Sequence, residues 1–243
     1  MSIIKIKKEE VSPIILLMMM FFCIVGSSIT GASARDTFFL TQFDRSLLPL
    51  MFALVAGLMV VAISIYNKIT SNLDLVKTII FSSVFFCITL FIIRFKLNGF
   101  VIPLFYAWTD VIISITIFQF WLLASEIFNP RQAKRLFSVI GIGGSVAGIS
   151  AGYLMRPFVL QFGAENLLIP TIIFIALIGV FAAFLNPFRA KKENDIKEKT
   201  NNKTSKNVFD PYLKSILVMV CAAAICSRII EYQFKITAAT TYS

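Results

Sequence analysis

The hydrophobic positions of this chain form long, nearly unbroken runs, without the strict alternation or the amphipathic spacing that is typical of elements in soluble proteins. A helix needs about 20 apolar residues to cross the hydrocarbon core of a bilayer. Short polar segments separate runs of this length at residues 12–34, 46–66, 76–95, 100–128, 136–162, 166–187 and 212–239. The pattern therefore predicts an all-α, polytopic membrane protein with seven spanning helices.

The composition supports a membrane environment. Of the 243 residues, 58% are hydrophobic and 15% are charged, whereas about a quarter of an ordinary soluble domain is charged. An aqueous globule of this size cannot bury so much apolar surface. These values exclude a soluble enzyme, a disordered protein and a nucleic-acid-binding protein, and the expected partner is the lipid bilayer. The first run is longer than the 7–15-residue core of a signal peptide, so we interpret it as a spanning helix.

The residues that usually carry catalysis are scarce. The chain has no histidine, which removes the commonest general base at neutral pH and the commonest zinc ligand. The four cysteines lie in apolar runs without CxxC spacing, as small buried hydrophobic residues do. No segment matches the GxxxxGK[ST] phosphate loop. We therefore expect no enzymatic activity, no metal and no cofactor.

The net charge of +10 is concentrated in a few connecting segments. A cytoplasmic N-terminus places most lysines and arginines on the inner side of the membrane, in agreement with the positive-inside rule. The richest segment, residues 188–211, is polar throughout and predicts a basic cytoplasmic linker. It divides the chain into a six-helix transmembrane bundle at residues 1–187 and a seventh helix at residues 212–243.

Several charged residues lie inside the apolar runs. Asp110 is about 15 Å from the outer end of the fourth run, where a charge is costly and usually faces a cavity. It is either a structural ion pair or protonated acid, or a group that acts on substrate or protons. Arg35 and Arg156, near outer ends, are either interfacial anchors or attract an anionic substrate. The candidate residues for a substrate-binding site or translocation path are Arg35, Asp110, Glu126, Arg156, Arg228, Glu231 and Lys235.

The fifth run contributes two further features. Its small-residue spacing predicts a face that a second helix approaches closely, either for packing alone or as a sliding surface; the glycines are Gly141, Gly144, Gly148 and Gly152. The turn before it carries Arg131, Lys134 and Arg135 on one helical face. This cytoplasmic basic turn either sets topology at the lipid headgroups or contacts phosphate.

Three segments resemble one transporter family. SEIFNPRQAKRLFSVIGIGGSVAGISAG, at residues 125–152, is similar to the bacterial and plastid ATP/ADP translocase family and its major-facilitator-like relatives. ARDTFFLTQF, at 34–43, resembles the segment after the first helix of that family, and EYQFK, at 231–235, resembles its seventh-helix motif. The resemblance implies a major-facilitator-type fold of two six-helix halves. It also implies nucleotide transport (ATP and ADP, with protons or phosphate as co-substrates) across a bacterial plasma (inner) membrane.

Two functions remain open from the sequence. The first is a secondary carrier of nucleotides or another organic anion that works by alternating access. The second is a non-transporting membrane protein, or an inactive gene fragment with the same fold. Because one bundle and a seventh helix make up only part of such a carrier, we expect the chain to be truncated. It would then need a missing C-terminal half or a second copy.

Overall fold

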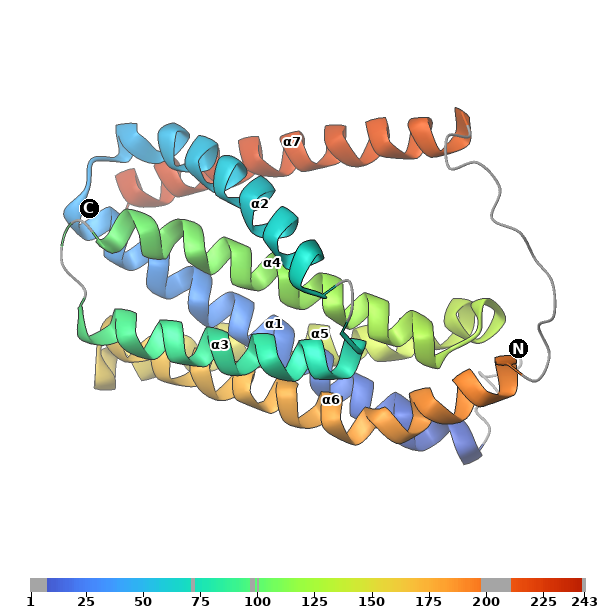
Figure 1. The fold of residues 1–243 in the computed structure, drawn as a ribbon. Helices are drawn as coiled ribbons and strands as arrows, with labels where there is room; N and C mark the ends of the chain where they lie inside the picture. Colours follow the sequence, from blue (N-terminus) through green and yellow to red (C-terminus); the bar gives the residue numbers. More distant parts are fainter. Residues whose placement is uncertain (1–7, 71–72, 97–98, 100, 198–210, 242–243) are drawn as a thin grey trace, which may run out of the picture.

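The computed structural model describes residues 8–70, 73–96, 99, 101–197 and 211–241, and this part of the chain is helical (Figure 1). Six of its helices are long and apolar enough to cross a membrane, which indicates an integral membrane protein. The predicted all-α class and the first six apolar helices are confirmed. The elements are α1 (Lys8–Gln42), η1 (Arg45–Leu47), α2 (Leu48–Thr70), α3 (Leu75–Phe95), α4 (Val101–Ile127), α5 (Pro130–Phe162), η2 (Ala164–Leu167), α6 (Leu168–Lys197) and α7 (Pro211–Thr241).

Two boundaries differ from the sequence-based expectation. α1 continues through residues 35–42, which were expected to follow the first helix. α6 continues to Lys197 and so includes the first part of the expected linker, while residues 198–210 lie outside the described residues. A seventh helix forms where it was expected. Its membrane crossing stays a prediction, because the side chains of residues 211–217 are not among those described.

α1 is the central helix of the bundle. It lies between α4 on one side and α5 and α6 on the other (Figure 1). Its apolar side chains enter two buried clusters, one at each end of the bundle: Leu17 and Met20 lie in the first and Phe39 in the second, all with no exposed surface. A helix that is apolar on every side and packed on three sides becomes the axis around which the other helices are positioned.

Glycines bring α5 close to α1. A Cβ atom on Gly143 would lie 2.3 Å from the carbonyl oxygen of Met18, and one on Gly144 would lie 2.6 Å from the ring of Phe21. Of the other expected packing glycines, Gly141, Gly148 and Gly152 meet no described atom within 4 Å. Residues four apart on a helix of 3.6 residues per turn rotate by about 40° at each step. Gly148 and Gly152 are therefore turned progressively away from α1. Gly143, which is next to Gly144, contacts α1 instead.

α7 is held differently from the other helices. The large apolar side chains described between residues 218 and 230 are more than half exposed, including Val218, Met219 and Ile225. Figure 1 shows α7 beside α2 and α4 at its C-terminal half and separated from the bundle at its N-terminal half. The contacts that keep α7 in place come mainly from charged and aromatic side chains at residues 228–235.

Candidate functional site

Arg35 is the centre of a group of charges within the bundle. α1 continues for two more turns to Gln42, so Arg35 lies within the helix and not at its end. Only 4% of the surface of Arg35 is exposed. Its guanidinium donates a hydrogen bond to Asp110 of α4 and stacks 4.6 Å from the ring centre of Tyr106. The interpretation of Arg35 as an anchor at the membrane surface is therefore wrong: its side chain points into the protein and is paired there.

α7 reaches this group through Lys235. The ammonium group of Lys235 donates hydrogen bonds to Asp36 of α1 at 2.9 Å, to the hydroxyl of Tyr106 at 3.0 Å and to Glu231 at 2.7 Å. Lys235 is 8% exposed, although most of the described side chains of α7 are exposed. A single side chain thus joins α7 to both α1 and α4.

Glu231 and Arg228 complete the group. Glu231 accepts a hydrogen bond from Arg35 at 3.3 Å and another from Arg228 at 2.8 Å. Arg228 also lies 3.8 Å from the second carboxylate oxygen of Asp110. The spacing of three and four residues along α7 puts Arg228, Glu231 and Lys235 on one helical face, which is the face turned toward α1 and α4.

We call these seven residues the central ion cluster: Arg35, Asp36, Tyr106, Asp110, Arg228, Glu231 and Lys235. Its three cations each face at least one of its three carboxylates, and the formal charges of the cluster sum to zero. Buried charges persist in a low-dielectric environment only when they are paired in this way. One acceptor remains unused, because the second oxygen of Asp110 is buried without a hydrogen-bond partner among the described residues.

The structure brings together five of the seven expected path residues and separates two. Glu126 lies at the far end of α4, and Arg156 is exposed on α5. Sequence reasoning did not select Asp36 and Tyr106. Asp36 is next to Arg35 in the chain, and Tyr106 is one helical turn before Asp110, so the i, i+4 rule was the signal available for Tyr106.

Glu126 belongs to a second group, which we call the end cluster: Asp74, Glu126 and Arg189. Arg189 near the end of α6 donates hydrogen bonds to Glu126, in the last turn of α4, and to Asp74, the residue before α3. The hydrogen bond from Arg189 lowers the pKa of Asp74 below its usual value. The end cluster therefore ties three helices together at the end of the bundle opposite the loop between α3 and α4.

The three basic residues of the turn before α5 lie in different environments. Arg131 and Lys134 are exposed, whereas Arg135 donates a hydrogen bond to Glu10 of α1 at 2.6 Å. Gln132 donates a second one to Glu10 at 2.8 Å. Glu10 is 6% exposed, so these bonds satisfy a buried carboxylate. Of the three basic residues, Arg135 thus holds α5 against α1, and the exposed pair remains available to headgroups or phosphate.

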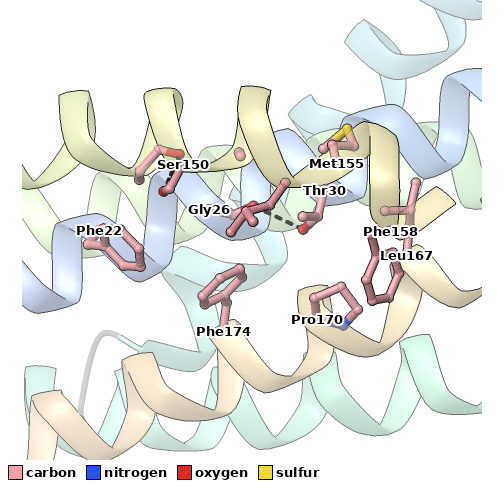
Figure 2. Close-up of a pocket in the computed structure, with 12 residues that line it drawn as sticks. Phe22, Gly26, Thr30, Ser150, Met155, Phe158, Leu167, Pro170 and Phe174 are labelled. Atoms are coloured by element: carbon pink, nitrogen blue, oxygen red, sulfur yellow. Dashed lines mark hydrogen bonds between the residues drawn. The ribbon is translucent and has the colours of Figure 1, made fainter. Parts of the chain in front are cut away.

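A cavity of about 240 Å³ lies between α1, α5 and α6 (Figure 2). Its wall is apolar, and the hydroxyl groups in it are already bonded. Thr30 pairs with Thr171 at 2.8 Å and donates to the carbonyl of Gly26 at 2.9 Å, and Ser150 donates to the carbonyl of Val146 at 2.8 Å. This cavity offers no unused polar group to a charged substrate, so the central ion cluster is the better candidate site.

No protein-family model, curated protein or solved structure matches this chain. The resemblance to the ATP/ADP translocase family therefore stays a prediction, and function is inferred from the residues and their geometry.

Proposed function

We propose that this protein is a membrane carrier that moves an organic anion by alternating access, with nucleotides such as ATP and ADP as the expected substrates. The supporting observation is the central ion cluster, which joins α7 to α1 and α4 within apolar helices. Charged residues are rare inside membranes, where they mark substrate paths and proton relays. No other group of described residues combines opposite charges from three separate helices with such burial.

The cations of the cluster suit an anion with several oxygen atoms. Arg35 and Arg228 each present a planar guanidinium that matches phosphate and carboxylate geometry. Their present partners are carboxylates of the protein itself. An anionic substrate would bind by exchanging with these carboxylates, so that occupied and empty sites have different interhelical pairs. A carrier needs such a difference between two states.

The proposed architecture is of the major-facilitator type. The bundle at residues 1–187 and the helix at 212–243 would belong to different halves, and the central ion cluster would lie where the halves meet. In such a carrier a second six-helix bundle packs against the first. We propose the bacterial inner membrane as the location, with a cytoplasmic N-terminus and a cytoplasmic linker. Labelling of Lys203→Cys from outside intact cells with an impermeant reagent would contradict this orientation.

Anion binding is the first test, because it requires the cluster but no complete transport cycle. Labelled ATP, ADP and phosphate are titrated onto the protein in nanodiscs, and uptake into liposomes follows. Arg35→Gln should abolish saturable binding, and Asp110→Asn should lower uptake while membrane insertion is unchanged. The matched control is Arg156→Gln, which removes an exposed arginine outside the cluster and should change neither measurement.

The second candidate function is a structural one, in which the central ion cluster only connects helices. The balance of charges within the cluster favours this role, because every charge already has a partner. In that case the ion pairs only dock α7, and the protein does not transport. Arg35→Gln would then loosen α7, while no anion would bind the unaltered protein in a saturable manner. This pair of results would replace the carrier by a non-transporting membrane protein.

A further inference from the structure

Glu231 of α7 contacts every cation of the central ion cluster. Its carboxylate accepts hydrogen bonds from Arg35 at 3.3 Å, from Arg228 at 2.8 Å and from Lys235 at 2.7 Å. The other two carboxylates of the cluster each form ion pairs with two of these cations. Among the described residues, the carboxylate of Glu231 therefore occupies the position in the cluster where one anionic group contacts all three cations.

This position lies on the accessible side of the cluster. The side chains of Glu231 and Arg228 are 28% and 44% exposed, whereas those of Arg35 and Asp110 are 4% and 8% exposed. An approaching anion can therefore reach the cations at Glu231 while the buried pair of Arg35 and Asp110 stays in place. Two guanidinium groups and an ammonium group that converge on one point are the donors that a phosphate or carboxylate group binds.

The carboxylate of Glu231 can leave this position without a movement of α7. Its side chain rotates about several bonds, while Arg228 and Lys235 keep their places on the same helix. An oxyanion in place of the carboxylate would bridge Arg35 of α1 to these two residues of α7. Helix α7 would then stay docked through the bound anion, with all three cations still paired.

The charges of the cluster indicate what accompanies this exchange. The empty cluster is neutral, and an oxyanion adds at least one negative charge to it. The displaced carboxylate of Glu231 also loses its contacts with three cations. An unpaired carboxylate in apolar surroundings favours its neutral form. One proton from solution, bound to a carboxylate oxygen of Glu231, turns the carboxylate into a carboxylic acid and removes one negative charge.

The neighbours of Glu231 explain why this residue takes the proton. Asp36 keeps Lys235 as a partner after the exchange, and Asp110 keeps Arg35, so Glu231 alone loses every partner. α2 adds only the uncharged ring of Phe52, at 5.9 Å from Arg228 and 5.8 Å from Lys235. The titratable or charged side chains that face Glu231, directly or through its cations, are Arg35 and Asp36 of α1, Tyr106 and Asp110 of α4, and Arg228 and Lys235 of α7.

We infer that Glu231 holds the place of the substrate oxyanion in the empty protein, and that a phosphate or carboxylate group displaces it with the uptake of one proton by Glu231. The inference rests on the proposed carrier function and adds to it the residue that the substrate replaces and the proton that accompanies the substrate. Glu231 also lowers the apparent affinity for the anion, because only the fraction of the protein whose cations are free of Glu231 binds substrate.

The test compares the unaltered protein with Glu231→Gln, which removes the carboxylate. ADP is titrated onto the full chain in nanodiscs by calorimetry, in two buffers of the same pH that differ in ionisation enthalpy. The difference in measured heat between the buffers gives the number of protons taken up per ADP bound, and protons of ADP itself contribute equally to both proteins. Glu231→Asp keeps the carboxylate. The matched control is Asp44→Asn, which removes an exposed carboxylate outside the cluster.

We expect Glu231→Gln to bind ADP roughly tenfold more tightly than the unaltered protein at neutral pH, because no carboxylate competes for the cations. It should take up about one proton fewer per ADP bound. By linkage, the advantage of Glu231→Gln in affinity should grow by up to about tenfold for each unit of rising pH. Glu231→Asp should keep the proton uptake, and Asp44→Asn should match the unaltered protein in both measurements.

Two results would overturn the inference and leave the carrier function in place: equal proton uptake by the unaltered protein and Glu231→Gln, or weaker binding by folded Glu231→Gln. Circular dichroism and melting temperature check folding. Where the single variant does not fold, the double variant Arg228→Gln with Glu231→Gln keeps the charges balanced and should also lose the proton uptake, and uptake retained there would equally overturn the inference. Absence of saturable ADP binding in both the unaltered protein and Glu231→Gln would contradict the carrier function itself.

Discussion

α1 and α7 are helices of similar length, 35 and 31 residues, but the protein holds them by different forces. α1 is fixed by buried apolar side chains and by glycine contacts with no spare space. α7 exposes most of its described apolar side chains and is bound to the bundle chiefly through charged groups. The first kind of contact allows one arrangement only, whereas the second can be exchanged for other partners.

Lipid explains why the difference matters. Lipid tails are as apolar as leucine, so burial of an apolar face adds little to helix association within a membrane. Close packing and polar pairs therefore decide which helices stay together. A helix that is held by ion pairs separates when those pairs are replaced, while a helix that is packed through glycines stays. We expect any large movement in this protein to occur at α7.

The largest expected effect comes from replacing Arg35, the α1 residue that pairs with Glu231 of α7 and with Asp110 of α4. Arg35→Met leaves Asp110 buried without its main partner, which should lower the free energy of unfolding by about 3–5 kcal/mol. The double variant Arg35→Met with Asp110→Leu should recover most of that loss, because both charges are then absent. Unfolding in mixed detergent micelles measures both variants. Equal destabilisation by the single and double variants would argue against this ion pair.

The second largest effect on stability is expected from the glycine contact between α5 and α1, which does not involve α7. Gly143→Ala forces a Cβ against the backbone of Met18 and should lower the free energy of unfolding by about 1–3 kcal/mol. Gly148→Ala is the matched control, since nothing described lies within 4 Å of its Cβ. Tryptophan fluorescence during thermal unfolding compares the two. Similar melting temperatures would mean that α5 does not approach α1 at Gly143.

A smaller effect on the bundle, but a clear one on α7, is expected for Lys235→Met. Asp36 and Glu231 keep contacts with Arg35 and are each about a quarter exposed, so the bundle itself should lose less stability than it does in Arg35→Met. α7 should become more mobile. A spin label on the exposed Cys226, with the other cysteines replaced, reports this mobility, and Lys235→Arg serves as the control that keeps the charge. Unchanged spectra would show that other contacts hold α7.

The smallest effect concerns the end cluster and pH. Because Arg189 lowers the pKa of Asp74 in the folded protein, the carboxylate stabilises the fold above its unfolded pKa, and this stabilisation is lost as the pH falls through the lowered value. The pair is partly exposed, so we expect less than about 1 kcal/mol. Stability from pH 7 down to pH 3 should fall less steeply in Asp74→Asn than in the unaltered protein. Identical slopes would contradict the assignment.

The sequence by itself determined that the protein is helical and membrane-embedded, and it located six apolar helices to within a few residues at most ends. Apolar length is a local property, so the hydropathy of each segment is sufficient. α1 shows the limit of this reasoning. Its polar stretch after Ala34 indicated the end of a helix, but buried partners allow the helix to continue to Gln42.

Tertiary structure decided which charges meet. Arg35 pairs with residues 75 and 196 positions away in the chain, and no local pattern specifies such a pairing. The i, i+4 spacing put Tyr106 beside Asp110 on α4, but only the fold brought Tyr106 to Arg35 and Lys235 and left Arg156 outside the cluster. The packing of α5 on α1 likewise chose Gly143 over Gly148, because the rotation of a helix about its axis depends on the neighbours that it packs against. Burial and pairing of polar groups are properties of the assembled bundle, since each depends on side chains that other helices supply.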